Sequence, residues 1–152
     1  MVKARGDQMT GDLLSWQPPK VEARLEEERV RAATLAGKVC RVLAEALKVD
    51  GRSREDIAAE VSEFLGEEIS RDSLDAWASE ARERNNVAAY RLIALVKVLG
   101  APAILNELLA DTDMLVVDRK YKALIERELA LETRARLDRF IEAQDAAWRA
   151  HK

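Results

Sequence analysis

The fold of this chain is decided by the stretch Ser53-Arg-Glu-Asp-Ile-Ala-Ala-Glu-Val-Ser-Glu-Phe-Leu-Gly66, followed by Glu67-Glu-Ile-Ser-Arg-Asp-Ser-Leu-Asp-Ala-Trp-Ala-Ser79. Ser53 can cap a helix, with Asp56 three residues later as in a variant of the capping box. Apolar residues then recur at helical spacing, at Ile57, Val61, Phe64 and Leu65. Gly66 can adopt the left-handed conformation that ends a helix. The first segment is therefore predicted to be a helix that ends in a tight turn.

The second segment is predicted to be a helix with one apolar and one polar side. Ser70 can cap it, Asn85-Asn86 can end it, and its apolar side holds Leu74, Trp77, Ala78 and Ala81. The opposite side carries polar residues, namely Arg71, Asp72, Asp75, Ser79 and Arg82. In a helix-turn-helix, this side of the second helix enters the major groove of DNA. We therefore predict a helix-turn-helix over residues 53–84, with the small Ala59 where its two helices approach.

The composition favours an all-α protein. The 152 residues are 48% hydrophobic and 35% charged but only 5% aromatic, which is typical of helices with solvated charged faces rather than of sheets. The single Cys40 excludes an internal disulfide and is expected to be a small buried hydrophobic residue. No transmembrane run or signal peptide is recognisable, so we expect a cytoplasmic protein that has no membrane partner.

Charge is distributed unevenly along the chain. The formal charge is +3 for residues 1–54, −8 for residues 55–113 and +2 for residues 114–152. Phosphate contacts supply most non-specific affinity for DNA. The acidic middle part, which contains the predicted second helix, therefore argues against simple DNA binding. A DNA contact would need charge from the basic flanking parts.

Three parts are predicted along the chain. Residues 1–19 form a flexible tail, whose apolar cluster around Trp16 either covers a groove in the core or binds a partner as a linear motif. Residues 20–113 form a helical domain that contains the helix-turn-helix. Residues 114–152 form a C-terminal helix that is expected to oligomerise.

About six helices are predicted in total. A long helix over residues 21–49 precedes the helix-turn-helix, and a helix over residues 88–99, apolar nearly all round, is expected at the centre of the domain. Gly100-Ala-Pro102 begins a short helix with inward residues Ile104, Leu105, Leu108 and Leu109. Residues 114–117 are expected to be a buried lead into the last helix. That helix, over residues 120–150, has an interrupted apolar stripe without strict heptads, which suits a coiled-coil pair or packing across another helix.

Catalytic chemistry has little support in the sequence. The single histidine, His151, is the penultimate residue, which makes a Cys–His pair or a zinc site improbable. The glycines form no phosphate-binding loop. The carboxylate pairs Glu67-Glu68 and Asp111/Asp113 lack a companion histidine or a defined loop, so turn and cap roles are favoured over metal binding. We therefore expect no enzyme activity, no metal and no cofactor.

A resemblance adds to this interpretation. Three stretches, Arg31-Ala-Ala-Thr-Leu-Ala-Gly-Lys38, Gly51-Arg-Ser-Arg-Glu-Asp-Ile-Ala-Ala-Glu60 and Ile69-Ser-Arg-Asp-Ser-Leu-Asp-Ala-Trp-Ala-Ser-Glu-Ala-Arg82, resemble small proteins of Mu-like transposable bacteriophages and prophages. The likeness covers nearly the whole chain, and it implies a helix-turn-helix regulator in a bacterial host cell. The stretch from Ile69 to Gly100 is also similar to phage regulators of the repressor and lysogeny-control type. The aspartate at position 72 differs from the residue type that begins the recognition helix in those regulators, and its carboxylate would repel phosphate.

The predicted function is a phage transcriptional regulator, or accessory DNA-binding factor, that binds double-stranded DNA as a homodimer through its terminal helices. The residues expected to face DNA are Ser70, Arg71, Ser73 and Arg82, with Arg52 and Arg54 on phosphate. One alternative is an adaptor that binds a phage or host protein through the acidic residues near the turn, Glu63, Glu67, Glu68 and Asp75. A second alternative is a helical assembly scaffold that binds neither.

Overall fold

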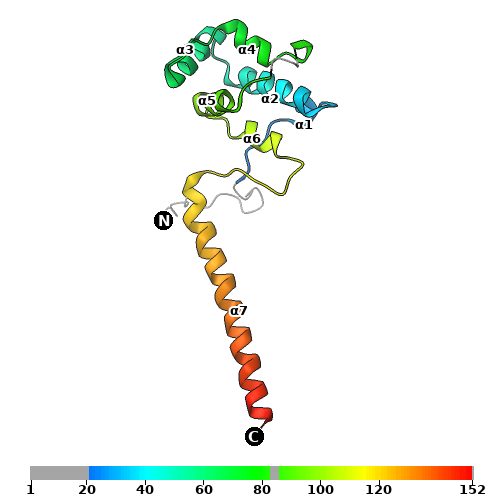
Figure 1. Ribbon diagram of the computed structural model, residues 1–152, viewed down its shortest axis with the longest axis vertical. Helices are drawn as coiled ribbons and strands as arrows, with labels where there is room; N and C mark the ends of the chain where they lie inside the picture. Colours follow the sequence, from blue (N-terminus) through cyan, green and yellow to red (C-terminus); the bar gives the residue numbers. More distant parts are fainter. Residues whose placement is uncertain (1–20, 83–85, 152) are drawn as a thin grey trace, which may run out of the picture.

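The structure, a computed structural model, describes residues 21–82 and 86–151. Over these residues the chain is helical with no strand, so the all-α prediction is confirmed. The elements are α1 (Glu27–Val30), α2 (Leu35–Asp50), α3 (Arg54–Leu65), α4 (Arg71–Trp77), the 3₁₀ turn η1 (Glu80–Arg82), α5 (Ala89–Leu99), α6 (Ala103–Leu108), the 3₁₀ turn η2 (Arg119–Tyr121) and α7 (Lys122–Ala150). Helices α1 to α6 gather into one domain, from which α7 projects (Figure 1). The predicted tail, with Trp16, lies outside the described residues.

Three of the four predicted ends of the central helix pair are confirmed, both ends of the first helix and the start of the second. The Ser53 hydroxyl accepts a hydrogen bond from the Asp56 amide at 3.0 Å at the start of α3. Gly66 ends α3 with a left-handed φ of 68°. The Ser70 hydroxyl then caps α4 by accepting a hydrogen bond from the Ser73 amide at 3.1 Å. These contacts are local, so short sequence signals are sufficient to predict them.

The predicted continuous helix over residues 21–49 is wrong. Residues 21–26 are not helical, α1 is a single turn, and the chain leaves the helix at Arg31, where ψ is 126°. The side chain of Thr34 accepts a hydrogen bond from the Gly37 amide at 3.0 Å and begins α2 as a new helix. This side-chain cap competes with helix continuation inside an otherwise helical pattern.

The second helix of the pair is also shorter than predicted. It ends at Trp77, and η1 follows where the prediction extended α4 to residue 84. An ion pair between Arg41 of α2 and Glu80 holds η1 against the neighbouring helix. As a result Ala81, which was predicted to be buried, is exposed. The end of α4 is therefore set by a contact between distant residues, which helical spacing does not reveal.

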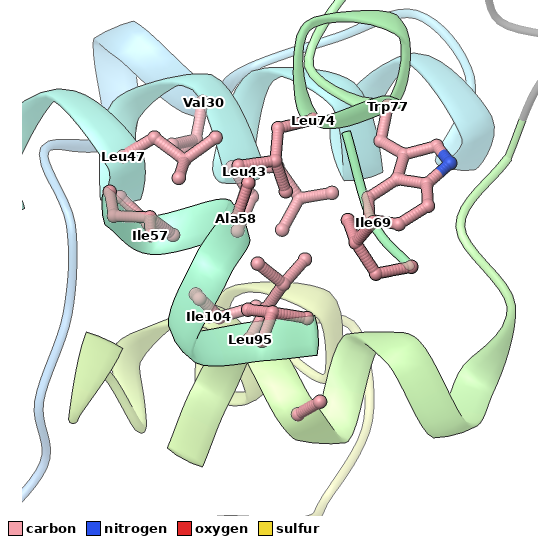
Figure 2. Close-up of a cluster of buried hydrophobic side chains, with 14 residues drawn as sticks. Val30, Leu43, Leu47, Ile57, Ala58, Ile69, Leu74, Trp77, Leu95 and Ile104 are labelled. Carbon is pink, nitrogen blue, oxygen red and sulfur yellow. The ribbon is translucent and has the colours of Figure 1, made fainter. Parts of the chain in front are cut away.

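Helix α2 is the centre of the domain, not the helix over residues 88–99. Helix α2 buries seven of its residues, including Cys40, which was predicted to be buried. Helix α5 buries only Ala94 and Leu95. The core gathers side chains from α1 to α6 (Figure 2), and its largest fully buried apolar members are Leu43, Ile57, Leu74, Leu95, Ile104, Val30, Val42 and Val61.

Two further burial predictions for α3 and one for the loop after α6 are wrong. Phe64 is 54% exposed, and Ala58 rather than Ala59 is the buried small residue of α3. The other large residues of the predicted stripe face the core, since Ile57 and Val61 are fully buried. Met114 and Leu115, expected in a buried lead, are exposed on a segment without helix.

Helix α6 fixes the two segments that flank the domain. Its buried Asn106 donates hydrogen bonds from Nδ2 to the carbonyls of Ala23 (3.1 Å) and Val116 (3.0 Å). Its buried Glu107 accepts a hydrogen bond from the Leu25 amide at 3.1 Å. The predicted last helix is confirmed as α7, which follows η2 directly.

Candidate functional site

The turn between α3 and α4 is fixed by Ser62, a residue that the sequence reasoning did not identify. Its hydroxyl donates to the Ala58 carbonyl at 2.7 Å and accepts from the Ile69 amide at 2.9 Å. Ile69 is buried in the core directly before the cap of α4. The start of α4 is consequently held in one direction, with Ser70, Arg71 and Asp72 exposed. A serine within a helix gives no local sign of such a contact across a turn.

Ser70 and Ser73, both predicted to face DNA, lie together at the start of α4. The Ser70 hydroxyl accepts from the Ser73 amide, and the two hydroxyl oxygens are 3.0 Å apart. The polar atoms that would read bases are therefore already hydrogen-bonded within the helix cap.

Arg71 is the exposed cation at this end of α4, and carboxylates hold it. Its Nη1 lies 2.7 Å from Glu55 Oε1 on α3, and its Nε lies 3.5 Å from Asp75 Oδ2 one turn further along α4. The hydrogen bond to Glu55, followed by the charge of Glu55 and the contact with Asp75, raises the pKa of the Arg71 guanidinium. Arg54 joins the same group, with its Nε 3.4 Å from Asp75 Oδ1. The structure thus brings together Arg54, Arg71 and two carboxylates.

Arg52 lies apart from this group and links three elements. Its guanidinium donates to Asp50 at the end of α2, to both carboxylate oxygens of Glu60 on α3 at 2.7 Å, and to the Val98 carbonyl on α5 at 3.0 Å. The hydrogen bond from Arg52 lowers the pKa of the Asp50 carboxyl, and the two acids together raise the pKa of Arg52. A guanidinium has five N–H donors, and most of those of Arg52 are used. A phosphate contact would therefore have to replace these internal bonds.

Arg82, the last predicted DNA contact, lies in η1 beyond the opposite end of α4 and is exposed. The structure does not gather it with Ser70 and Arg71. The six predicted residues consequently form one cluster at the start of α4, one separate arginine at the α2–α3 junction and one at η1.

An acidic face lies along the outer side of α3. We define the acidic face as Asp56, Glu60, Glu63 and the exposed Phe64, which are exposed and recur at helical spacing. Glu63 and Glu68 have no cation within ion-pair distance among the described residues, and the same is true of Asp72. By contrast Glu67 contacts two residues of α5. Arg91 Nε lies 2.8 Å from Glu67 Oε1, and the Tyr90 hydroxyl donates a hydrogen bond to the same oxygen at 3.2 Å. The hydrogen bond from Arg91 lowers the pKa of Glu67.

Other kinds of site find little support within residues 21–82 and 86–151. No group of three histidine, cysteine or acidic side chains in this part of the chain is placed to hold a metal ion. No described helix has the length and apolar character needed to cross a membrane. A cleft of about 680 Å³ runs between the α1–α2 segment and α6. Two ion pairs of the cleft lining, Arg24–Glu107 and Lys38–Asp111, are both 3.6 Å long.

Comparisons with protein-family models, with curated proteins and with solved structures find no match for this chain.

Proposed function

We propose that the α3–α4 unit is a protein-interaction module that binds a basic segment of a partner, the adaptor role considered above. The observation that carries the proposal is electrostatic. Arg52, Arg54 and Arg71 are each paired with carboxylates of the same chain, while Glu63, Glu68 and Asp72 have no described cation partner. Like charges placed against phosphate lower affinity, whereas the same surface attracts a cationic protein segment.

Phe64 gives this acidic face an apolar anchor. It is 54% exposed on α3 beside Glu63. Aromatic residues that a partner can bury inside a polar rim are enriched at protein interfaces. A basic helix or peptide could therefore place aliphatic stems over Phe64 and its charges over the neighbouring carboxylates.

The second candidate is the phage DNA-binding regulator. One observation favours it: the polar start of α4 is solvent-exposed, as base contact by a recognition helix requires. In this case the Arg71 guanidinium would break its ion pair with Glu55 and contact a phosphate or a base edge instead. The nearby Asp72 and Asp75 oppose this exchange, which is why we rank the regulator second.

A mobility-shift assay with the duplex upstream of the chain's own gene, at 50 and 200 mM salt, separates the two proposals. For the adaptor we expect no salt-dependent shift. For the regulator we expect binding that weakens with salt, with a log–log slope that Arg71→Ala flattens by about 0.9.

Affinity capture from host cells tests the adaptor directly, with variants as internal references. Glu63→Lys and Phe64→Ala should each release a protein that the wild type retains. Glu142→Lys, the same charge change at an exposed position of α7, should retain it. Capture that is indifferent to Glu63→Lys, together with a salt-sensitive DNA shift, would overturn the adaptor proposal.

A further inference from the structure

Among the residues that the structure describes, helix α7 has no contact that explains its stability. It is 29 residues long, and none of its residues, all of which are described, is buried. Most helical stability in proteins comes from packing an apolar face rather than from intrinsic propensity. Its isolation from the helical domain is visible in Figure 1. The described helical domain therefore leaves α7 uncovered, as an interface helix would be before its partner binds.

One side of α7 carries the residues that such a surface would cover. We define the α7 stripe as the following positions along one side, spaced three or four residues apart except for the adjacent Phe140 and Ile141: Ile125, Leu129, Thr133, Leu137, Phe140, Ile141, Gln144 and Trp148. Its six large apolar side chains are between 46% and 62% exposed. Apolar residues this numerous on a single helix side mark an interaction surface rather than ordinary surface variation.

We propose that the α7 stripe binds the α7 stripe of a second copy of this chain in antiparallel orientation. The spacing supports this choice of partner, because the stripe is nearly symmetric about Leu137. Steps of four residues lead from Leu137 back to Ile125, and steps of three or four lead forward to Trp148. Antiparallel pairing with residues 136 and 137 at the crossing point sets Ile125 of each copy against Trp148 of the other. The pairing does not depend on the function proposed for α3 and α4.

Charges beside the stripe favour the antiparallel orientation. On one flank, this register places Arg127 against Asp145 of the second copy and Arg134 against Asp138 of the second copy. On the other flank it places Glu132 against Arg139 of the second copy. By symmetry each contact occurs twice, which gives six complementary contacts. The same register has one like-charge contact, between Arg136 of one copy and Arg136 of the other, so complementary contacts are in the majority.

Parallel pairing is less favourable by the same reasoning. In a parallel pair, a flanking residue faces the residue five positions further along the other helix. Arg134 would then face Arg139 of the second copy, and the only complementary flanking contact would be that of Arg127 with Glu132. The antiparallel pair also separates the two helical domains, because each is attached to the first residue of its α7. The two Tyr121 residues would lie about 45 Å apart, at 1.5 Å per residue.

The first experiment measures the mass of the full-length chain by light scattering over a range of concentrations, with the sequence intact and with single substitutions. We expect a dimer for the wild type and a monomer for Leu137→Glu. The matched control is Leu131→Glu, the same change on the opposite side of α7, which should remain dimeric. A monomeric wild type at about 100 μM, or a dimer broken by Leu131→Glu but not by Leu137→Glu, would overturn the proposal.

The second experiment tests orientation without altering the stripe. Arg127→Glu and Asp145→Arg should each weaken the dimer by roughly three- to tenfold, and the double variant should recover most of this loss. The two positions are 18 residues apart, about 27 Å along one helix, so they cannot compensate each other within a chain. Additive losses in the double variant would refute the antiparallel register, even if the chain is a dimer.

Discussion

Replacing Asn106 by alanine tests whether α6 fastens the two segments that connect the helical domain to the rest of the chain. Asn106 is 2% exposed and makes three side-chain hydrogen bonds to backbone groups. Nδ2 donates to the Ala23 and Val116 carbonyls at 3.1 and 3.0 Å, and Oδ1 accepts from the Val116 amide at 2.7 Å. Alanine removes all three bonds at once.

The expected loss of stability follows from these contacts. Each hydrogen bond contributes a net ~0.5–1.5 kcal/mol, and a backbone group left buried without a partner adds to the loss. Since residues next to Ala23 and Val116 are partly exposed, water can satisfy some of the freed groups. We therefore expect Asn106→Ala to lower the free energy of unfolding by about 2–4 kcal/mol. This is a large share of the roughly 5–15 kcal/mol that stabilises an ordinary domain.

Urea unfolding followed by circular dichroism measures this change. The control is Asn86→Ala, at an exposed position of the loop before α5, where we expect a change within about 0.5 kcal/mol. Asn106→Asp adds a second comparison, because an ionised carboxylate cannot donate to the Ala23 and Val116 carbonyls. It should destabilise the domain more at pH 7 than at low pH, where a protonated carboxyl regains one donor. If Asn106→Ala behaves like Asn86→Ala, the bonds that it makes do not hold the two segments.

Three further predictions concern the α3–α4 unit. Gly66→Ala should destabilise by about 1 kcal/mol in thermal unfolding, because φ of 68° is costly for a residue with a Cβ even though no atom lies within 4 Å of the added carbon. Ser70→Ala should cost about 1 kcal/mol through the lost cap to Ser73, whereas Ser70→Asn should restore most of it, and equal losses would contradict a capping role. Because the hydrogen bond from Arg91 lowers the pKa of Glu67, this pair stabilises the fold above about pH 4.5 and ceases to do so as the pH falls through the depressed pKa. Glu67→Gln should therefore flatten the decline of the melting temperature in acid, and an unchanged decline would show that the pair contributes no stability.

The residue types of the predicted DNA-binding site do not reveal which groups those residues contact in the folded chain. The sequence places Arg52, Arg54 and Arg71 near one another, and each could contact phosphate. Which carboxylate they meet depends on how α2, α3 and α5 pack. The Val98 carbonyl reaches Arg52 only because the end of α5 lies beside α3. The exposure of Phe64 was missed for a related reason: Phe64 fits an apolar stripe by spacing, and only packing shows that its side chain lies outside the core.

Local sequence signals are sufficient for the all-α class, the caps at Ser53 and Ser70, the turn at Gly66 and the existence of the last helix. These features depend on composition and on contacts between residues at most four positions apart, so the local signals are complete. Tertiary packing sets where α4 ends, how α6 fastens the flanking segments, and which groups of other helices meet Arg52 and Arg71. Those outcomes depend on contacts such as Arg41–Glu80 and Asn106–Ala23, between residues far apart in the chain, whose meeting no local pattern encodes.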